Sequence, residues 1–408
     1  MLEKLGARAI AAPFAIPIVL FLVLGTAVSP ILMAGMNDIP FAIVTLDEGS
    51  SLPISDVNIG DELVERLQNG EGLDALQDSE NESETSLGNV SIAWAQLGSE
   101  EELREALADN RYYGGIIIPK DFTAQQMMSA TGLGGAPTIT VLLNDAKNPM
   151  LAQQMGPNLK SAMLQAGISV EVEEVNEADI GGGTMAPMMA VQMLVMPLFI
   201  MTLVGSVLLS VVTWPRNGAP RRQRIIALVK QLIVGTILSA FIACIALGIE
   251  LWIARLDLPV EQMFPFLWLA CACMMAAITG LCDLALPLGA LAGITTFALG
   301  MSCAMLAYEM LPPFWQEWVY PWAPQHFMGD GLRAIIYLGA EPFANSLQYW
   351  LTLTAIGAAA AFLAILVPAH GPKSPRHVIP AAAEPKTPER PSHALSPAAK
   401  RRRLPLFR

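Results

Sequence analysis

The side chains that most often act as metal ligands or nucleophiles are few in this sequence and widely spaced. The five cysteines lie in apolar stretches, at Cys244, Cys271, Cys273, Cys282 and Cys303, and the histidines are His326, His370, His377 and His393. Neither set has the paired spacing of a zinc site, and no convergent Ser/His/Asp or Cys/His cluster indicates covalent catalysis. We therefore predict no catalytic residue and no metal or cofactor bound by this chain. The cysteines are interpreted as small buried residues.

Nucleotide binding is tested in the same way. A phosphate-binding loop needs the pattern Gly-x-x-x-x-Gly-Lys-Ser/Thr, whose backbone and lysine hold the phosphates. The sequence lacks this pattern, and its glycine-rich stretch Gly132–Gly135 has no lysine. We interpret that stretch as a surface turn, so this chain cannot hold ATP phosphates itself.

Arginines are concentrated in one short segment. It runs from Pro215 to Arg224 and contains Arg216, Arg221, Arg222 and Arg224. A guanidinium makes paired, directional hydrogen bonds to carboxylates, which suits contact with an acidic partner. The chemistry of this chain is therefore predicted to be recognition rather than catalysis.

The elements that position these residues are predicted to be membrane spans. The chain is 53% apolar and only 15% charged, and roughly 20 apolar residues cross a hydrocarbon core about 30 Å thick. Six stretches are long enough: Ala11–Met33, Met188–Val212, Ile225–Ile253, Phe264–Cys282, Leu286–Leu306 and Tyr349–Val367. We interpret the first as a retained anchor rather than a signal peptide, because it is long and interrupted by prolines.

The distribution of Lys and Arg predicts the orientation of these spans. The loop 213–224 and the tail 371–408 are basic, whereas the connections 254–263 and 308–348 hold one arginine each and several acids. Because positive loops stay in the cytoplasm, both termini are predicted to be cytoplasmic and residues 37–187 extracytoplasmic. We expect a multi-pass protein of a bacterial plasma membrane.

The predicted spans carry almost no charge. Lys230 and Glu250 lie toward opposite ends of the third span, and Asp283 lies in the short turn after the fourth. A carrier driven by protons or ions usually needs an ionisable group within the membrane. We therefore infer that energy, if it is used, comes from another protein.

The segment between the first two spans is predicted to be an extracytoplasmic α/β domain. It carries 25 Asp and Glu against six Lys and Arg, and it has the length of one domain. Strand patterns occur at Phe41–Leu46, Tyr112–Ile118 and Thr138–Leu143, and helical patterns at Gly60–Leu67, 99–107, after Pro119 and over most of Pro149–Val175. The run Gly181–Gly183 predicts a flexible joint, and the polar stretch Asp74–Val90 predicts a mobile loop.

The fold class is thus an α-helical membrane protein with six transmembrane helices, one plus five, and the α/β domain inserted after the first. We divide the chain into residues 1–36 (cytoplasmic segment and first span), 37–187 (outer domain), 188–370 (five-helix membrane domain) and 371–408 (disordered basic tail). A segment at about 306–346 is too broken by prolines to span the membrane.

Four stretches of this sequence carry a family resemblance: Ala42–Gly49 (AIVTLDEG), Asn58–Val64 (NIGDELV), Tyr112–Thr123 (YYGGIIIPKDFT) and Pro321–Arg333. In this order they resemble the type-2 ABC exporter permeases, specifically the phage-infection-protein (YhgE/Pip) branch. The resemblance extends to about Pro368. Thr45, where the family often has Asn, and the short outer domain depart from its pattern.

The resemblance implies a permease that pairs with a second copy or a paralogue and is powered by a separate ABC ATPase subunit, which uses the ATP. Arg216, Arg221, Arg222 and Arg224 would then form the coupling loop that docks on the ATPase. The alternative interpretation is that these arginines only hold the loop in the cytoplasm.

The segment at about 306–346 also has two interpretations. By resemblance, Pro312, Pro313, Trp315 and Trp318 belong to short re-entrant helices at the outer end of the transport route; otherwise they form an outer loop with interfacial tryptophans. Arg333 would contact a lipid or substrate phosphate, or pair with Asp330 or Glu341.

The tail is rich in proline and ends in a basic cluster with Arg401, Arg402 and Arg403. We expect either contact with anionic membrane lipids or solvated disorder, and no binding to nucleic acid.

The leading hypothesis is the permease subunit of an ABC exporter that moves an amphipathic or envelope-directed substrate outward. The alternative is a membrane scaffold or receptor that transports nothing, such as a phage receptor or a secretion-system accessory protein, and acts through its outer domain.

Overall fold

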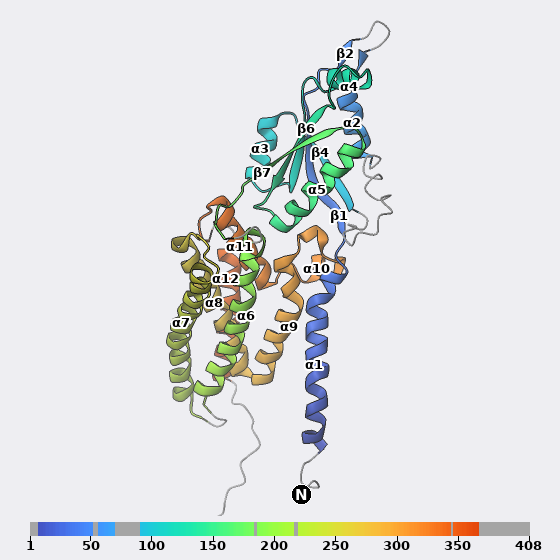
Figure 1. The fold of residues 1–408 in the computed structure, drawn as a ribbon. Helices are drawn as coiled ribbons and strands as arrows, with labels where there is room; N and C mark the ends of the chain where they lie inside the picture. The colour runs from blue at the N-terminus through green and yellow to red at the C-terminus, as the bar shows by residue number, and fades with distance from the viewer. Residues whose placement is uncertain are drawn as a thin grey trace, which may run out of the picture. The chain divides into compact units, whose positions relative to one another are not determined.

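The computed structural model describes residues 7–51, 56–69, 90–182, 186–215, 219–343 and 346–366, drawn as a ribbon in Figure 1. The chain divides into a unit from Met1 to Ala369 and a second unit from His370 to Arg408. The predicted tail, with Arg401, Arg402 and Arg403, lies outside the described residues, as do Arg216 and nearly all of the predicted loop Asp74–Val90.

Five helices in the described part of the chain are long and apolar enough to cross a membrane. They are α6 (Ala186–Thr213), α7 (Arg221–Trp252), α8 (Val260–Leu284), α9 (Leu286–Met305) and α12 (Leu347–Leu366). Each of them overlaps a predicted span. Helix α8 packs against the other four and forms the centre of the bundle (Figure 1).

The first predicted span corresponds to α1 (Ala7–Leu32), a helix of 26 residues that packs on α9. At 1.5 Å per residue it is about 39 Å long, which exceeds the hydrocarbon core. Its described side chains begin at Ile18, and the segment Phe21–Leu32 is an apolar helix shorter than a full span. Helix α1 is therefore long enough to cross a membrane, but it is not among the five candidate spans of the described residues.

Glycines bring α8 and α12 together. A Cβ atom at Gly280 would lie 2.2 Å from the carbonyl oxygen of Gly357, and a Cβ at Gly357 would lie 2.4 Å from that of Ala276. Van der Waals packing is a main force between helices in lipid, and small residues let backbones approach closely enough to gain it. A larger side chain at either glycine would separate the two helices.

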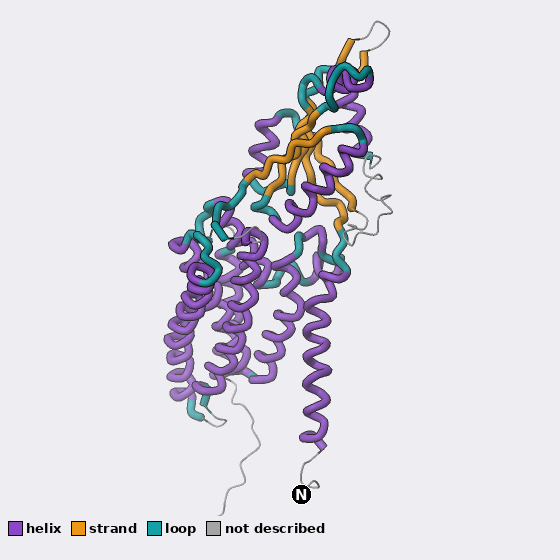
Figure 2. Tube along the Cα trace, viewed as in Figure 1, coloured by secondary structure: helices purple, strands orange, loops and turns teal. Residues whose placement is uncertain are grey.

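An α/β domain with a five-stranded sheet lies between α1 and α6 in the chain (Figure 2). In spatial order the strands are β4 (Val90–Gln96), β1 (Met36–Thr45), β5 (Gly114–Ile118), β6 (Thr138–Asn144) and β7 (Ser169–Val175). β6 runs antiparallel to β5, and the other neighbouring pairs are parallel. A separate two-stranded pair joins β2 (Ser50–Ser51) to β3 (Asp56–Val57).

Helices cover both faces of this sheet. They are α2 (Ile59–Gln68), α3 (Glu100–Ala108), α4 (Phe122–Ala130) and α5 (Pro149–Gln165). Because side chains alternate along a strand, Phe41 and Ile43 of β1 pack in the core that holds α2, α4 and α5. Ala42 and Val44 pack in a second core with α3. All five residues of β5 are buried, as predicted for a strand covered on both sides.

The prediction of a helix over most of Pro149–Val175 is confirmed, but the strand in its last third was not predicted. Helix α5 ends at Gln165, and β7 follows from Ser169. The chain reverses at Gly167, whose φ of +76° suits glycine, and pairing with β6 then holds the segment as a strand. Strand β4 was not predicted either. It begins at Val90, the last residue of the polar stretch Asp74–Val90 that was interpreted as a loop.

One carboxylate joins the two motifs AIVTLDEG and IPKDFT. Asp47, just after β1, accepts hydrogen bonds from the backbone N–H of Gly60 in α2 and of Thr123 in α4, each at 3.1 Å, and from the Thr123 hydroxyl. It thus satisfies donors at two helix N-termini, where negative charge is favoured. Gly60 is required there, since an added Cβ would lie 2.6 Å from Cβ of Asp47.

We predict that Asp47→Ala loosens the first turns of α2 and α4 locally, because their N–H donors lose a half-buried acceptor. The cost is about 1–2 kcal/mol, so hydrogen exchange at the amides of Gly60 and Thr123 should accelerate roughly tenfold in the full-length protein. Asp121→Ala is the control, since Asp121 precedes α4 without making a side-chain cap. Equal exchange in both variants would contradict this assignment.

Candidate functional site

The predicted coupling arginines have different environments. Arg221 and Arg222 are exposed in the first turn of α7. Arg224 is only 4% exposed, and its Nη1 donates to the carbonyl oxygen of Ala364 in α12 at 3.0 Å. Arg221 and Arg222 are therefore accessible to a partner, whereas Arg224 ties α7 to α12.

The segment predicted at about 306–346 forms short helices between α9 and α12. They are η3 (Tyr308–Met310), α10 (Pro313–Trp318) and α11 (Pro324–Leu338). Pro312 and Pro313 begin α10, where fixed φ angles and missing N–H groups are tolerated. Trp315 donates its Nε1–H to the carbonyl of Leu299 in α9 at 3.0 Å, whereas Trp318 is 68% exposed.

Arg333 forms the predicted ion pair with Asp330, and it also donates to the carbonyl of Ala304 at 3.3 Å. The second oxygen of Asp330 lies 2.7 Å from Nε2 of His326. Burial alone would raise the pKa of Asp330, but Arg333 and His326 outweigh burial and hold that pKa below its ordinary value. Asp330 is therefore ionised at neutral pH.

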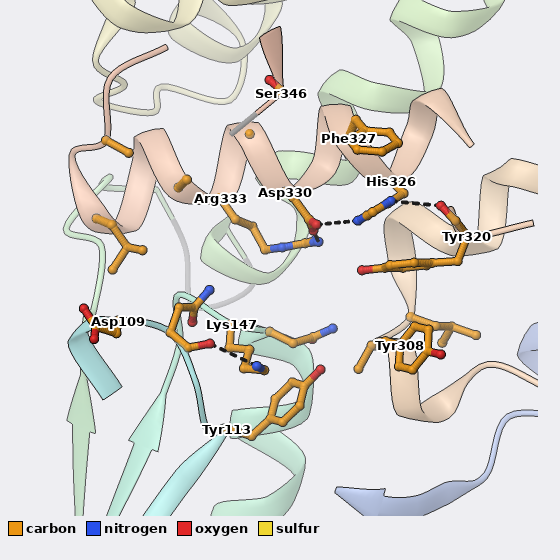
Figure 3. A pocket seen from close by; sticks show the side chains of 18 of the residues that line it. Asp109, Tyr113, Lys147, Tyr308, Tyr320, His326, Phe327, Asp330, Arg333 and Ser346 are labelled. Atoms are coloured by element: carbon orange, nitrogen blue, oxygen red, sulfur yellow. Dashed lines mark hydrogen bonds and ion pairs between the residues drawn. The ribbon is translucent and has the colours of Figure 1, made fainter. Parts of the chain in front are cut away.

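His326 is fixed from both sides. Its Nδ1 lies 3.0 Å from the carbonyl oxygen of Tyr320, and its ring stacks on the Tyr320 ring with centroids 3.6 Å apart. Figure 3 shows Tyr320, His326, Asp330 and Arg333 in one row along the wall of a cavity. This row holds α11 against the turn that precedes it.

The cavity has a volume of about 530 Å³ and is lined from two directions. The α/β domain contributes Tyr113 and Lys147, and the connection between α9 and α12 contributes Tyr308, Glu309 and Arg333 (Figure 3). The cavity therefore lies where the α/β domain meets the membrane-spanning part. This is a common location for ligand pockets.

A hydrogen bond between side chains of the two parts crosses this junction. The Tyr113 hydroxyl donates to Oε2 of Glu309 at 2.6 Å. Burial raises the pKa of Tyr113 well above its ordinary value, and the neighbouring carboxylate of Glu309 raises it further. Tyr113 therefore stays protonated and keeps its donor.

Lys147 supports the same junction from the outer domain. Its Nζ donates to the carbonyls of Asn110 and Arg111 at 3.0 and 2.9 Å and lies 4.9 Å from the centroid of the Tyr113 ring. Burial lowers the pKa of Lys147, although Glu309 and Asp330 oppose this. With charges of both signs beside aromatic faces, the cavity suits binding of a polar group rather than bond-breaking chemistry.

A second polar cluster lies within the membrane bundle. Asp283, in the last turn of α8, is 5% exposed and accepts hydrogen bonds from the Ser210 hydroxyl at 2.6 Å and from Nε2 of Gln231 at 3.0 Å. The expectation that Asp283 lies in the turn after the span is therefore wrong, because α8 continues two residues beyond Cys282 and includes Asp283. The carboxylate links α6 and α7, which flank the arginine-rich loop, to α8.

Four residues of the junction were not singled out in the sequence: Tyr113, Lys147, Glu309 and His326. Tyr113 was quoted within a motif without a role. Lys147 belongs to the α/β domain, whereas Glu309 and His326 belong to the connection between α9 and α12. No local spacing in the sequence indicates that these residues line one cavity.

We predict that Tyr113→Phe weakens the junction and leaves the α/β core intact, because it removes a hydroxyl that hydrogen-bonds a carboxylate. Such a bond contributes about 1.5–3 kcal/mol, so hydrogen exchange in residues 306–311 should accelerate about tenfold or more. Tyr112→Phe is the matched control, since no hydrogen bond of its hydroxyl occurs among the described residues. Unchanged exchange in Tyr113→Phe would show that the bond does not hold the junction.

The family comparison agrees with this architecture. Residues 10–366 match the model of the ABC-2 family transporter protein, which covers most of the chain and includes both the α/β domain and all five candidate spans. No curated protein and no solved structure matches the chain. Proteins of this family are membrane components of transporters and not the catalytic subunits, and they act with an ATPase partner in general. The chain belongs to the ABC-2 family of transporter proteins.

Proposed function

We propose that this chain is the permease subunit of an exporter, moving an amphipathic or envelope-directed substrate outward with energy from a separate ATPase subunit. The observation that carries this proposal is the family match across residues 10–366. Five candidate spans and the missing phosphate-binding loop support it, because a membrane part without an ATP site must receive energy from a partner.

The contact with the ATPase is assigned to the start of α7. Arg221 and Arg222 are exposed there, and each guanidinium has unused donors for carboxylates of a partner. Helix α6 leads into the loop and α7 follows it. Ser210, near the end of α6, and Gln231, in α7, both donate hydrogen bonds to Asp283 of α8. A displacement of the loop would therefore be passed to α8. Arg216 belongs to the same proposed loop.

We predict that Arg221→Glu combined with Arg222→Glu abolishes stimulation of the ATPase by the permease and weakens their complex at least tenfold, because two favourable contacts become repulsive. Copurification and ATP hydrolysis of the reconstituted pair measure this. The control is Arg66→Glu with Arg111→Glu, the same change in charge on exposed residues of the outer domain. Normal coupling in the loop variant would remove the docking role. Absence of any ATPase complex in the wild type would favour the scaffold or receptor alternative.

The orientation is part of the same proposal. We assign six spans, including α1, with both termini in the cytoplasm of a bacterial plasma membrane and residues 37–187 outside. The basic loop at the start of α7 and the acidic composition of residues 37–187 support this arrangement. A second permease copy or paralogue would complete the transport route. Contact of Arg401, Arg402 and Arg403 with anionic lipid stays a prediction.

We predict opposite accessibility for two single-cysteine variants. Leu133→Cys, at a position 84% exposed in the outer domain, should react with a membrane-impermeant maleimide on intact cells. Arg222→Cys should react only after permeabilisation. A background in which Cys244, the exposed native cysteine, is replaced by serine serves as the control. The reverse pattern would invert the topology and remove the exporter proposal.

The assignment to the phage-infection-protein branch is also proposed. Its support is that two stretches that carry the resemblance, Ala42–Gly49 and Tyr112–Thr123, meet through Asp47 and Thr123. The same residues explain the motif physically, since they anchor α2 and α4 to the sheet.

A further inference from the structure

We infer that the outer domain has a separate ligand site, a cavity beside the chain's return to the membrane that binds an organic ammonium group through Asp145 and the carboxylates around it. This inference does not rest on the export function. It uses residues that neither the coupling loop nor the junction cavity employs.

The cavity has a volume of about 950 Å³ and lies between α5, β7 and the segment 177–182. Four carboxylates line it, from Asp145, Glu174, Glu177 and Asp179, against a single lysine, Lys160. The cavity therefore carries an excess of negative charge. No ion pair joins any of these five side chains to another residue in the described ranges.

Asp145 differs from the other three acids because it is buried. The residue is 4% exposed, and its Oδ1 has no hydrogen-bond partner among the described residues. Glu174, Glu177 and Asp179 are exposed. A buried carboxyl oxygen without a hydrogen-bond partner costs free energy. The position of Asp145 beside a large acidic cavity therefore indicates that a cationic ligand binds there.

The electrostatic setting agrees with this. Burial, together with the charges of Glu174 and Glu177, raises the pKa of Asp145 to about 7. Burial raises the pKa of Tyr337 in α11, and the charge of Asp145 raises it further. The titratable groups Lys160 and Asp179 also line the cavity. A bound cation would reverse this effect and keep Asp145 ionised.

Organic ammonium is favoured over a metal ion for two reasons. No group of three or more His, Cys, Asp or Glu in the described ranges is arranged to hold a metal. The volume also exceeds the needs of one ion and suits a headgroup or a small amine. An ammonium provides several donors that can reach carboxylates spread around a cavity.

The location admits two sources of such a group. Ile180, on the cavity wall, is buried in the hydrophobic core of the membrane helices, and its carbonyl accepts from the N–H of Asp257 in the α7–α8 connection at 2.7 Å. The cavity thus lies next to the outer end of the spans. An aminated lipid headgroup and a soluble polyamine would both reach it.

The test is calorimetric titration of spermidine into the full-length protein in phosphatidylglycerol nanodiscs at pH 8. We expect Asp145→Asn to weaken binding at least tenfold, because it removes the buried charge. The matched control is Glu171→Gln. This change removes an exposed charge of β7, the strand that also carries Glu174, at a position outside the cavity, and should change affinity about twofold or less. Binding to the wild type should weaken from pH 8 to pH 6, as Asp145 gains a proton, and Asp145→Asn should lose most of this dependence.

Two further arms make the outcome decisive. Glu174→Gln with Glu177→Gln, on exposed positions that leave the fold intact, should also weaken binding if Asp145→Asn does not fold. Nanodiscs that contain phosphatidylethanolamine should displace spermidine if the natural source is a lipid headgroup, and should leave it unchanged if the source is soluble. Absence of spermidine binding, equal loss in Glu171→Gln, or tighter binding of Ca²⁺ than of spermidine would overturn the inference.

Discussion

Inside a bilayer no water is present to hydrate polar groups, and this constraint determines how the membrane part of the chain is built. Backbone N–H and C=O groups bond within each helix, and the few polar side chains must find partners on neighbouring helices. Asp283 does so through Ser210 and Gln231, and Arg224 through the carbonyl of Ala364. Close backbone packing is the other way in which helices are held together, as between Gly280 of α8 and Gly357 of α12. Asp283 and Arg224 therefore mark places where helices are linked, whereas the hydroxyls of Ser206 and Ser239 bond to carbonyls of their own helices.

The described residues attach the α/β domain to these helices at places far apart along the chain. Only three residues separate the end of α1 from the start of β1, so the central strand of the sheet follows the first helix almost directly. The return segment is fixed by the bond between Ile180 and Asp257, and the junction cavity is crossed by the bond between Tyr113 and Glu309. These two bonds join residues far apart in sequence, so they form only in the folded chain.

Carboxylates in the outer domain serve opposite purposes. Asp47 is satisfied by backbone donors of two helices and has a structural role. Asp145 is buried after the end of β6, and its Oδ1 has no hydrogen-bond partner among the described residues. Because its pKa is raised to about 7, the cost of ionising it in the folded chain grows as the pH rises above the ordinary carboxyl pKa and is complete above pH 7. Proteins retain such unfavourable groups mainly at binding sites. Of these two acids in the same domain, Asp47 stabilises the fold and Asp145 belongs to the candidate binding site.

The sequence alone predicted six spans, and five of them overlap helices long and apolar enough to cross a membrane. A run of about 20 apolar residues is a strong signal, because it depends only on neighbours in the chain. The sequence also determined the α/β character of residues 37–187 and the pair between Arg333 and Asp330, three residues apart on one helix. The end of α5 and the existence of β7 were missed, because pairing with β6 overrides the helical pattern. The junction cavity, the buried Arg224 and the environment of Asp145 were decided by tertiary structure alone. Their partners come from segments separated by 30 to 200 residues, and burial, which sets their charge and chemistry, is a property of the folded chain rather than of local sequence.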